Sequence, residues 1–162
     1  MNRSHWLAIS LTVLLSGCGE APAAKADAEP PATLPAGQYQ ATAKVTHLRS
    51  TDNTTPATKL KLGDTVTTQG CVGADGKPPP SLFVAAGDVC TIKDPFVREG
   101  RISISYDCKH GADKGHVGVG VDGHYTVDAF DAVAETDTYF VGSGDYIMKL
   151  AVTGKRVGQC KA

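Results

Sequence analysis

The sequence predicts an all-β domain over residues 37–162: a single antiparallel meander sheet of about seven strands, curled into an open or partial barrel, with two disulfides. Three observations support this fold class. Glycine accounts for 18 of the 162 residues and Thr and Val are common, which favours turns and strands over helices. After residue 17 no segment has the apolar period of a helix. Short segments of alternating apolar and polar residues recur instead, as in half-buried strands.

The N-terminus is organised like a signal peptide. A short basic start precedes an apolar run from Trp6 to Leu15, which is about half the length of a membrane-spanning helix. The run ends in Leu15-Ser16-Gly17-Cys18, which resembles the lipobox of bacterial lipoproteins. The resemblance implies cleavage between Gly17 and Cys18, removal of residues 1–17, and attachment of acyl chains such as palmitate to Cys18.

Residues 18–36 comprise the lipidated cysteine and an Ala/Pro-rich segment. We expect a disordered tether here, because the segment has too little apolar bulk to offset the entropy of ordering its chain. Glycine at position 19, where some lipoproteins have aspartate, implies sorting to the outer membrane by resemblance to Gram-negative lipoproteins. The protein is then expected to face the periplasm, with the membrane as a partner through the lipid anchor.

The first strands are predicted by alternation. Apolar and polar residues alternate from Gly37 to Thr46, with Tyr39 on the apolar face, and a second strand is expected at Thr65–Cys71. Residues 72–87 are expected to form an irregular loop. This loop contains Pro78-Pro79-Pro80, whose missing amide donors are incompatible with a central strand.

Further strands are expected at about Val89–Val97 and Arg101–Cys108, joined by a turn at Arg98-Glu99-Gly100. Near the C-terminus, Gly142-Ser143-Gly144-Asp145 has turn composition, and Tyr146–Val152 is the last expected strand.

The segment His116–Phe130 is expected to form a hairpin around a three-residue loop, Val121-Asp122-Gly123, with Gly123 in a left-handed conformation. This register separates an apolar from a polar face. Its apolar cross-strand pairs are Val119 with Tyr125 and Val117 with Val127. Its polar face places His116 opposite Asp128.

With Cys18 lipidated, four cysteines remain, an even number that predicts two disulfides in an oxidising compartment. The favoured pairing is Cys71–Cys90, which closes the proline loop, with Cys108–Cys160. A three-residue turn at residues 98–100 would instead place Cys90 opposite Cys108, so Cys90–Cys108 with Cys71–Cys160 stays open. The cysteines lack the close pairs typical of zinc sites, and no metal or cofactor is predicted.

The order of the cysteine-containing segments is distinctive. These segments are Thr67-Thr68-Gln69-Gly70-Cys71, Asp88-Val89-Cys90, Tyr106-Asp107-Cys108 and the C-terminal Gly154-Lys155-Arg156-Val157-Gly158-Gln159-Cys160. They resemble DUF3617, a family of small periplasmic proteins whose members typically end Gly-Arg-Arg-Ile-Gly-Asp-Cys. The resemblance covers roughly residues 37–160 and implies the compartment and a disulfide framework, but no activity. The chain departs from the family at Pro35-Ala36-Gly37-Gln38-Tyr39, where members have Pro-Gly-x-Trp-Glu.

The charge pattern argues against nucleic acid as a partner, because the formal net charge is −1 and no Lys/Arg run is present. We expect a non-catalytic envelope module that binds an apolar ligand or an envelope protein. A ligand would lie on the inner face of the curved sheet, which is expected to carry Tyr39, Val117, Val119, Tyr125 and Val127. The alternative is a periplasmic hydrolase that uses polar-face residues such as His116 and Asp128.

Overall fold

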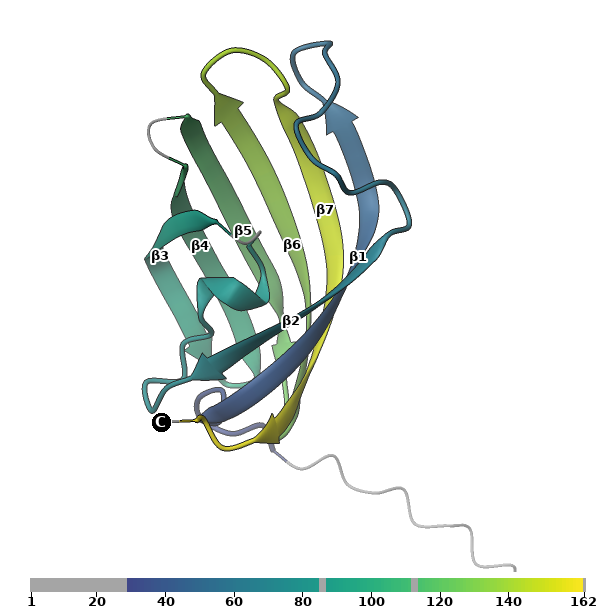
Figure 1. The fold of residues 1–162 in the computed structure, drawn as a ribbon. Coiled ribbons are helices and arrows are strands. Elements are labelled where there is room, and N and C mark those ends of the chain that lie inside the picture. Colours follow the sequence, from purple (N-terminus) through teal and green to yellow (C-terminus); the bar gives the residue numbers. More distant parts are fainter. Residues whose placement is uncertain (1–28, 85–86, 112–113, 162) are drawn as a thin grey trace, which may run out of the picture.

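Seven antiparallel strands form one sheet in the computed structural model, which describes residues 29–84, 87–111 and 114–161. The strands are β1 Gly37–Ser50, β2 Thr65–Val72, β3 Asp88–Arg98, β4 Arg101–His110, β5 Gly115–Tyr125, β6 Ala129–Phe140 and β7 Tyr146–Gly158. The sheet curls into a half-barrel, which confirms the predicted fold class (Figure 1). The predicted leader and Cys18 lie outside the described residues. In the described segments, no helix has the length and hydropathy needed to cross a bilayer.

The order of the strands across the sheet is β2-β1-β7-β6-β5-β4-β3. Strands β3 to β7 follow one another as a meander, and the hairpin of β1 and β2 joins this meander where β1 pairs with β7. The two free edges of the sheet are therefore β2 and β3, which are joined by the proline-containing loop.

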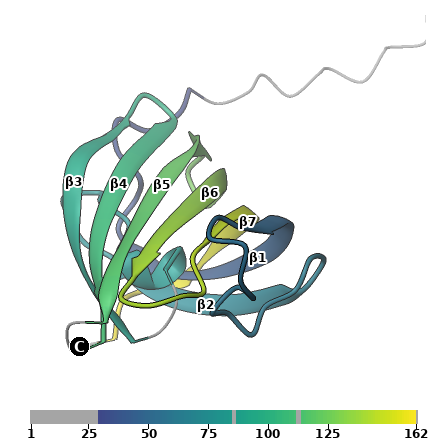
Figure 2. The same ribbon diagram turned by 90° about the horizontal axis from the view of Figure 1, so that it is seen from above.

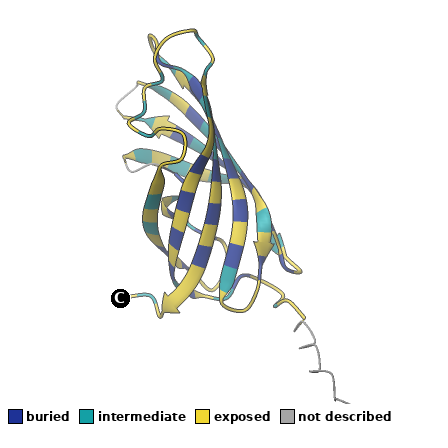
Figure 3. Cartoon of the chain, turned by 90° about the vertical axis from the view of Figure 1, so that its right-hand side faces the viewer, coloured by how far each residue is buried: buried dark blue, intermediate teal, exposed yellow. Residues whose placement is uncertain are grey.

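The core lies on the concave face of the sheet. Buried and exposed side chains alternate along the strands, as the stripes of Figure 3 show. The buried face carries aliphatic and aromatic side chains from β1 and from β4 to β7, among them Tyr39, Ile104, Val119, Phe130 and Leu150. The residues between them in each strand, most of which are polar, face outward on the convex side.

The proline-containing loop packs into this concave face. It includes the short 3₁₀ helix η1, Pro80–Leu82, which lies within the curve of the sheet (Figure 2). Leu82, Phe83 and Val84 are buried and belong to the same apolar cluster as the strands. The loop thus supplies the second layer that a half-barrel needs to exclude water from its inner face.

Residues 30–36, expected to belong to a disordered tether, instead lie against the end of the half-barrel where β1 begins and β5 ends. Leu34 is 1 % exposed. The Tyr39 hydroxyl donates a hydrogen bond to the carbonyl oxygen of Pro35, and the Tyr125 hydroxyl donates one to that of Pro31. The prediction of disorder is therefore wrong for these residues, which contribute to the core. We call this the lower end of the half-barrel, following Figure 1.

The predicted loop at residues 121–123 is wrong. Strand β5 continues to Tyr125, which pairs with Phe130, so the turn occupies residues 126–128. Gly123 allows β5 and β6 to approach each other closely, because a Cβ atom at this position would collide with the carbonyl oxygen of Asp131 and with Ala132. The valine–glycine alternation of β5 was consistent with both registers, so the apolar pattern alone did not identify the turn.

The favoured cysteine pairing is also wrong. The structure joins Cys71 to Cys160 and Cys90 to Cys108, the pairing that had stayed open. Cys90 lies directly opposite Cys108 in the β3–β4 ladder. On the other side of the sheet, Gln38 of β1 pairs with both Cys71 of β2 and Gly158 of β7, so the chain leaving β7 passes the start of β1 and reaches Cys71.

Candidate ligand-binding site

A cavity of about 60 Å³ lies in the upper half of the concave face, between the sheet and the loop that contains η1. Its walls are mostly apolar and include Ala43, Leu60, Val117, Val119, Met148 and Leu150. This volume is small beside the roughly 300–1,000 Å³ typical of clefts that bind drug-sized ligands. The cavity therefore suits a compact ligand group.

The loop after β2 forms the wall that faces the sheet. Leu82, Phe83 and Val84 all line the cavity. The ring of Phe83 lies 5.5 Å from that of Phe130 and 6.2 Å from that of Tyr106, measured between ring centroids. The Thr68 hydroxyl donates a 3.3 Å hydrogen bond to the carbonyl oxygen of Leu82. The wall is thus fixed both to β2 and to the aromatic part of the core.

One end of the cavity is polar. Asp88, the first residue of β3, lines it, and its side chain is only 5 % exposed. Asp88 Oδ1 lies 2.7 Å from Nδ1 of His110, whose side chain is 45 % exposed and whose ring centroid lies 4.8 Å from that of Phe140. The cavity therefore joins apolar walls to a nearly buried carboxylate.

Tyr146 lies beside this carboxylate and also lines the cavity. Burial raises the pKa of Tyr146, a hydrogen bond with Thr58 opposes the shift, and the charge of Asp88 adds to it. Tyr146 and Asp88 therefore both contribute polar groups to the lining of the cavity.

The loops at this upper end are braced by Asp52. Its Oδ1 accepts hydrogen bonds from the amide and hydroxyl of Thr54, and its Oδ2 accepts them from the amides of Gly144 and Asp145. The bonds from Thr54 contribute most to holding the pKa of Asp52 well below its usual range. The β1–β2 loop is thereby tied to the β6–β7 loop, which immediately precedes Tyr146.

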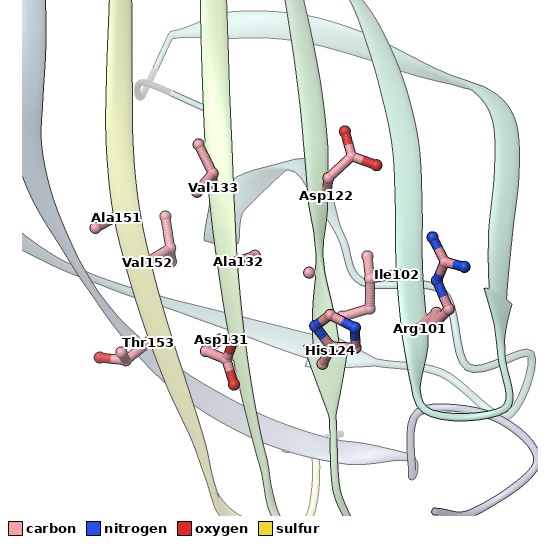
Figure 4. Close-up of a pocket in the computed structure, with 11 residues that line it drawn as sticks. Arg101, Ile102, Asp122, His124, Asp131, Ala132, Val133, Ala151, Val152 and Thr153 are labelled. Atoms are coloured by element: carbon pink, nitrogen blue, oxygen red, sulfur yellow. The ribbon is translucent and has the colours of Figure 1, made fainter.

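A larger hollow of about 450 Å³ lies on the convex face (Figure 4). Arg101, His124, Asp131 and Thr153 cross it as one row, because each is opposite the next in the ladders of β4 to β7. No ion pair joins these four side chains among the residues that the structure describes. The hollow is open and mixed in charge, and nothing in it favours one ligand chemistry.

The family model described as "Protein of unknown function (DUF3617)" matches residues 32–160. The chain belongs to the DUF3617 family. Comparison with curated proteins and with solved structures found no match. The matched region begins within the packed N-terminal segment and ends at Cys160, so it contains both disulfides of this DUF3617 domain.

The structure brings four of the five residues of the predicted ligand face to the concave side. Val117 and Val119 line the cavity of the DUF3617 domain, whereas Tyr39 and Tyr125 lie at its lower end and hydrogen bond to the N-terminal segment. Val127 is 55 % exposed in the β5–β6 turn, so its assignment to this face is wrong. The error follows from the misplaced hairpin loop.

The predicted pair of His116 and Asp128 is not formed. His116 lies at the start of β5, opposite Tyr139, and its Nδ1 is 3.1 Å from Asp107 Oδ1. Asp128 lies in the turn after β5, at the other end of the strand, where its carbonyl oxygen accepts a hydrogen bond from the Arg156 amide. The two side chains cannot act together as an acid–base pair in this arrangement.

Sequence reasoning missed the pair of Asp88 and His110. The signal was present, because Asp88 has the same strand parity as Cys90 and Ile92 and so belongs to the inward face of β3. Cys108, which lies two residues before His110, is in a disulfide and so cannot bind a metal beside this histidine. Among the described residues, no cluster of three or more potential ligands is arranged to hold a metal ion.

Proposed function

We propose that the protein is a non-catalytic lipoprotein of the cell envelope, anchored through Cys18 in the outer membrane and facing the periplasm, and that it binds a small ligand in the concave cavity. The signal-peptide pattern that ends in Leu15-Ser16-Gly17-Cys18 supports the anchor. Two disulfides fit a protein that matures in an oxidising compartment.

The cavity is the observation that carries the binding role. An apolar pocket with a small number of convergent polar groups is typical of ligand sites. The cavity lies at the upper end, with Asp88 and Tyr146, whereas residues 30–36 pack at the lower end. A ligand in the cavity would therefore lie at the end of the domain remote from the proposed membrane anchor.

A cavity-filling variant tests the binding role. Ala43 lines the cavity, so Ala43→Leu places three more carbon atoms in it. Ala151 is in the neighbouring strand β7 and faces the convex side, so Ala151→Leu is a matched control. Full-length protein is extracted from membranes in mild detergent and examined by native mass spectrometry for a bound small molecule.

We expect wild type and Ala151→Leu to retain the bound molecule and Ala43→Leu to lose it. Wild-type protein without any bound molecule, or equal retention by both variants, would contradict a ligand in the cavity. The anchor is tested separately with Cys18→Ser, which we expect to move the protein from the membrane to the soluble fraction. Retention of Cys18→Ser in the membrane would contradict lipid anchoring at this residue.

A further inference from the structure

We propose that the cavity takes the head of a primary alkylammonium compound and that Asp88 is the residue that selects it. This proposal rests on the proposed function, since it assigns a ligand class to the same cavity. Three features carry it: the burial and charge of Asp88, the aromatic ring beside it, and the size of the enclosed space.

The first feature is the carboxylate of Asp88, which is nearly buried and has few polar partners. Removing a charge from water is costly unless a partner of opposite charge or several hydrogen bonds replace the solvent. In the described part of the chain, no Lys or Arg forms an ion pair with Asp88, and His110 provides its one side-chain hydrogen bond, at Oδ1. Among the described residues, Oδ2 of Asp88 has no side-chain hydrogen bond. An ammonium group in the cavity would donate a hydrogen bond to this oxygen and place a positive charge next to the carboxylate.

The second feature is the surroundings of that charge. Tyr146 lines the cavity next to Asp88, and the Phe140 ring packs against both Tyr146 and His110. A cation is attracted to the face of an aromatic ring as well as to a carboxylate, and both attractions strengthen where water is excluded. The same negative charge would repel a carboxylate or phosphate ligand.

The third feature is size. A space of about 60 Å³ accommodates an ammonium group and a short, unbranched hydrocarbon segment. Aliphatic walls such as Leu60, Val117 and Met148 suit the hydrocarbon segment. The small volume favours a compact head group over a bulky one. The geometry therefore points to an unbranched primary amine in its protonated form.

The probes are n-butylammonium chloride and n-butanol, which share a hydrocarbon chain and differ in charge. Each is titrated at constant ionic strength near pH 7.5 into full-length protein in detergent, and binding is followed by the NMR shifts of cavity residues such as Val119 and Met148. We expect saturable shifts with butylammonium and a dissociation constant about tenfold or more below that of butanol, the gain typical of a charge-assisted hydrogen bond in a desolvated site.

Asp88→Asn keeps the shape of the side chain and removes its charge, so it should abolish the preference for butylammonium. Asp107→Asn is the matched control, because Asp107 is also paired with a histidine, His116, but both side chains are about half exposed on the convex face. We expect Asp107→Asn to keep the preference.

Two results would overturn the assignment of an ammonium ligand. One is a wild-type protein that binds butanol at least as tightly as butylammonium, which needs no variant and leaves the proposed binding role standing. The other is a preference for butylammonium that survives Asp88→Asn. If neither probe shifts the cavity resonances, the ammonium assignment fails, and the cavity itself is judged by the native mass spectrometry of Ala43→Leu.

Discussion

At the residue scale, three tyrosines of the concave face attach irregular segments of the chain to the sheet. Each hydroxyl donates to the carbonyl oxygen of a proline: Tyr39 to Pro35, Tyr106 to Pro78 and Tyr125 to Pro31. The aromatic rings fill the core while the hydroxyl groups reach segments that have no ladder partners for their carbonyls. These bonds explain how proline-containing segments become part of the packed domain.

Tyr106 gives the most direct test of this role. Its ring is buried, and its hydroxyl donates a 2.8 Å hydrogen bond to Pro78, which is itself fully buried. Tyr106→Phe would leave that carbonyl without a partner, at an expected cost of about 1–3 kcal/mol in the free energy of unfolding. Urea denaturation measures this change. Tyr139→Phe is the control, because Tyr139 is 64 % exposed, and we expect it to have little effect.

The same variant should change the response of stability to alkaline pH. Burial raises the pKa of Tyr106 from its ordinary value of 10.0, so the folded protein keeps this phenol neutral where the unfolded chain ionises it. Its contribution is therefore complete below pH 10 and is lost as the pH rises further. We expect the free energy of unfolding of wild type to fall more steeply above pH 10 than that of Tyr106→Phe. Parallel curves would contradict this.

At the scale of elements, alternation identified the strands but not their partners. The expected segments from Gly37, Arg101 and Tyr146 all lie in strands. The expected turn at residues 98–100 is shorter, because Arg98 belongs to β3 and pairs with Arg101, which leaves Glu99 and Gly100 as the turn. The β5–β6 turn was misplaced because Gly123 fits two roles, a left-handed loop position and a close approach between strands. In the structure Gly123 has the second role, the close approach between strands. This role depends on Ala132 of the neighbouring strand, which the sequence around Gly123 does not identify.

The same limit applied to the cysteines and to the site. Pairing Cys71 with Cys160 depends on β1 lying between β2 and β7, which is a property of the whole sheet. In the cavity, Val117 and Val119 were predicted from the apolar face of their strand. Asp88 and His110 were not, because their meeting requires the β3–β4 register.

A thiol count tests the pairing at this scale. Cys71→Ala/Cys160→Ala removes one disulfide and should leave no free thiol among the remaining cysteines of the domain, whereas Cys71→Ala/Cys90→Ala should break both disulfides and leave two. The alternative pairing, Cys71–Cys90 with Cys108–Cys160, reverses these numbers. Titration of thiols in denaturant distinguishes them. The disulfide of Cys71 and Cys160 spans 89 residues, so its loss should lower the free energy of unfolding by about 4.6 kcal/mol on the chain-entropy model.

At the scale of the whole molecule, a half-barrel must cover an inner face and two free edges. The loop with η1 covers the face and contacts the edge strand β2. The other edge, β3, contains a register shift next to Asp94 and Pro95, and such irregularity hinders pairing with another chain. The loop with η1 and the register shift in β3 are both irregular in backbone conformation. The composition of such segments indicates that they are not regular strands, but it does not indicate how they pack.

The N-terminal segment completes this cover at the lower end, and Leu34 is its most buried residue. Removing the buried side chain in Leu34→Ala should lower the free energy of unfolding by about 2–5 kcal/mol, because the strands around it cannot collapse fully into the space. Leu62→Ala is the matched control, since Leu62 is 69 % exposed and its loss should change stability little. Chemical denaturation of both variants makes the comparison. Equal stability of Leu34→Ala and Leu62→Ala would mean that residues 30–36 are a free tether in solution, with the lower end of the sheet left uncovered.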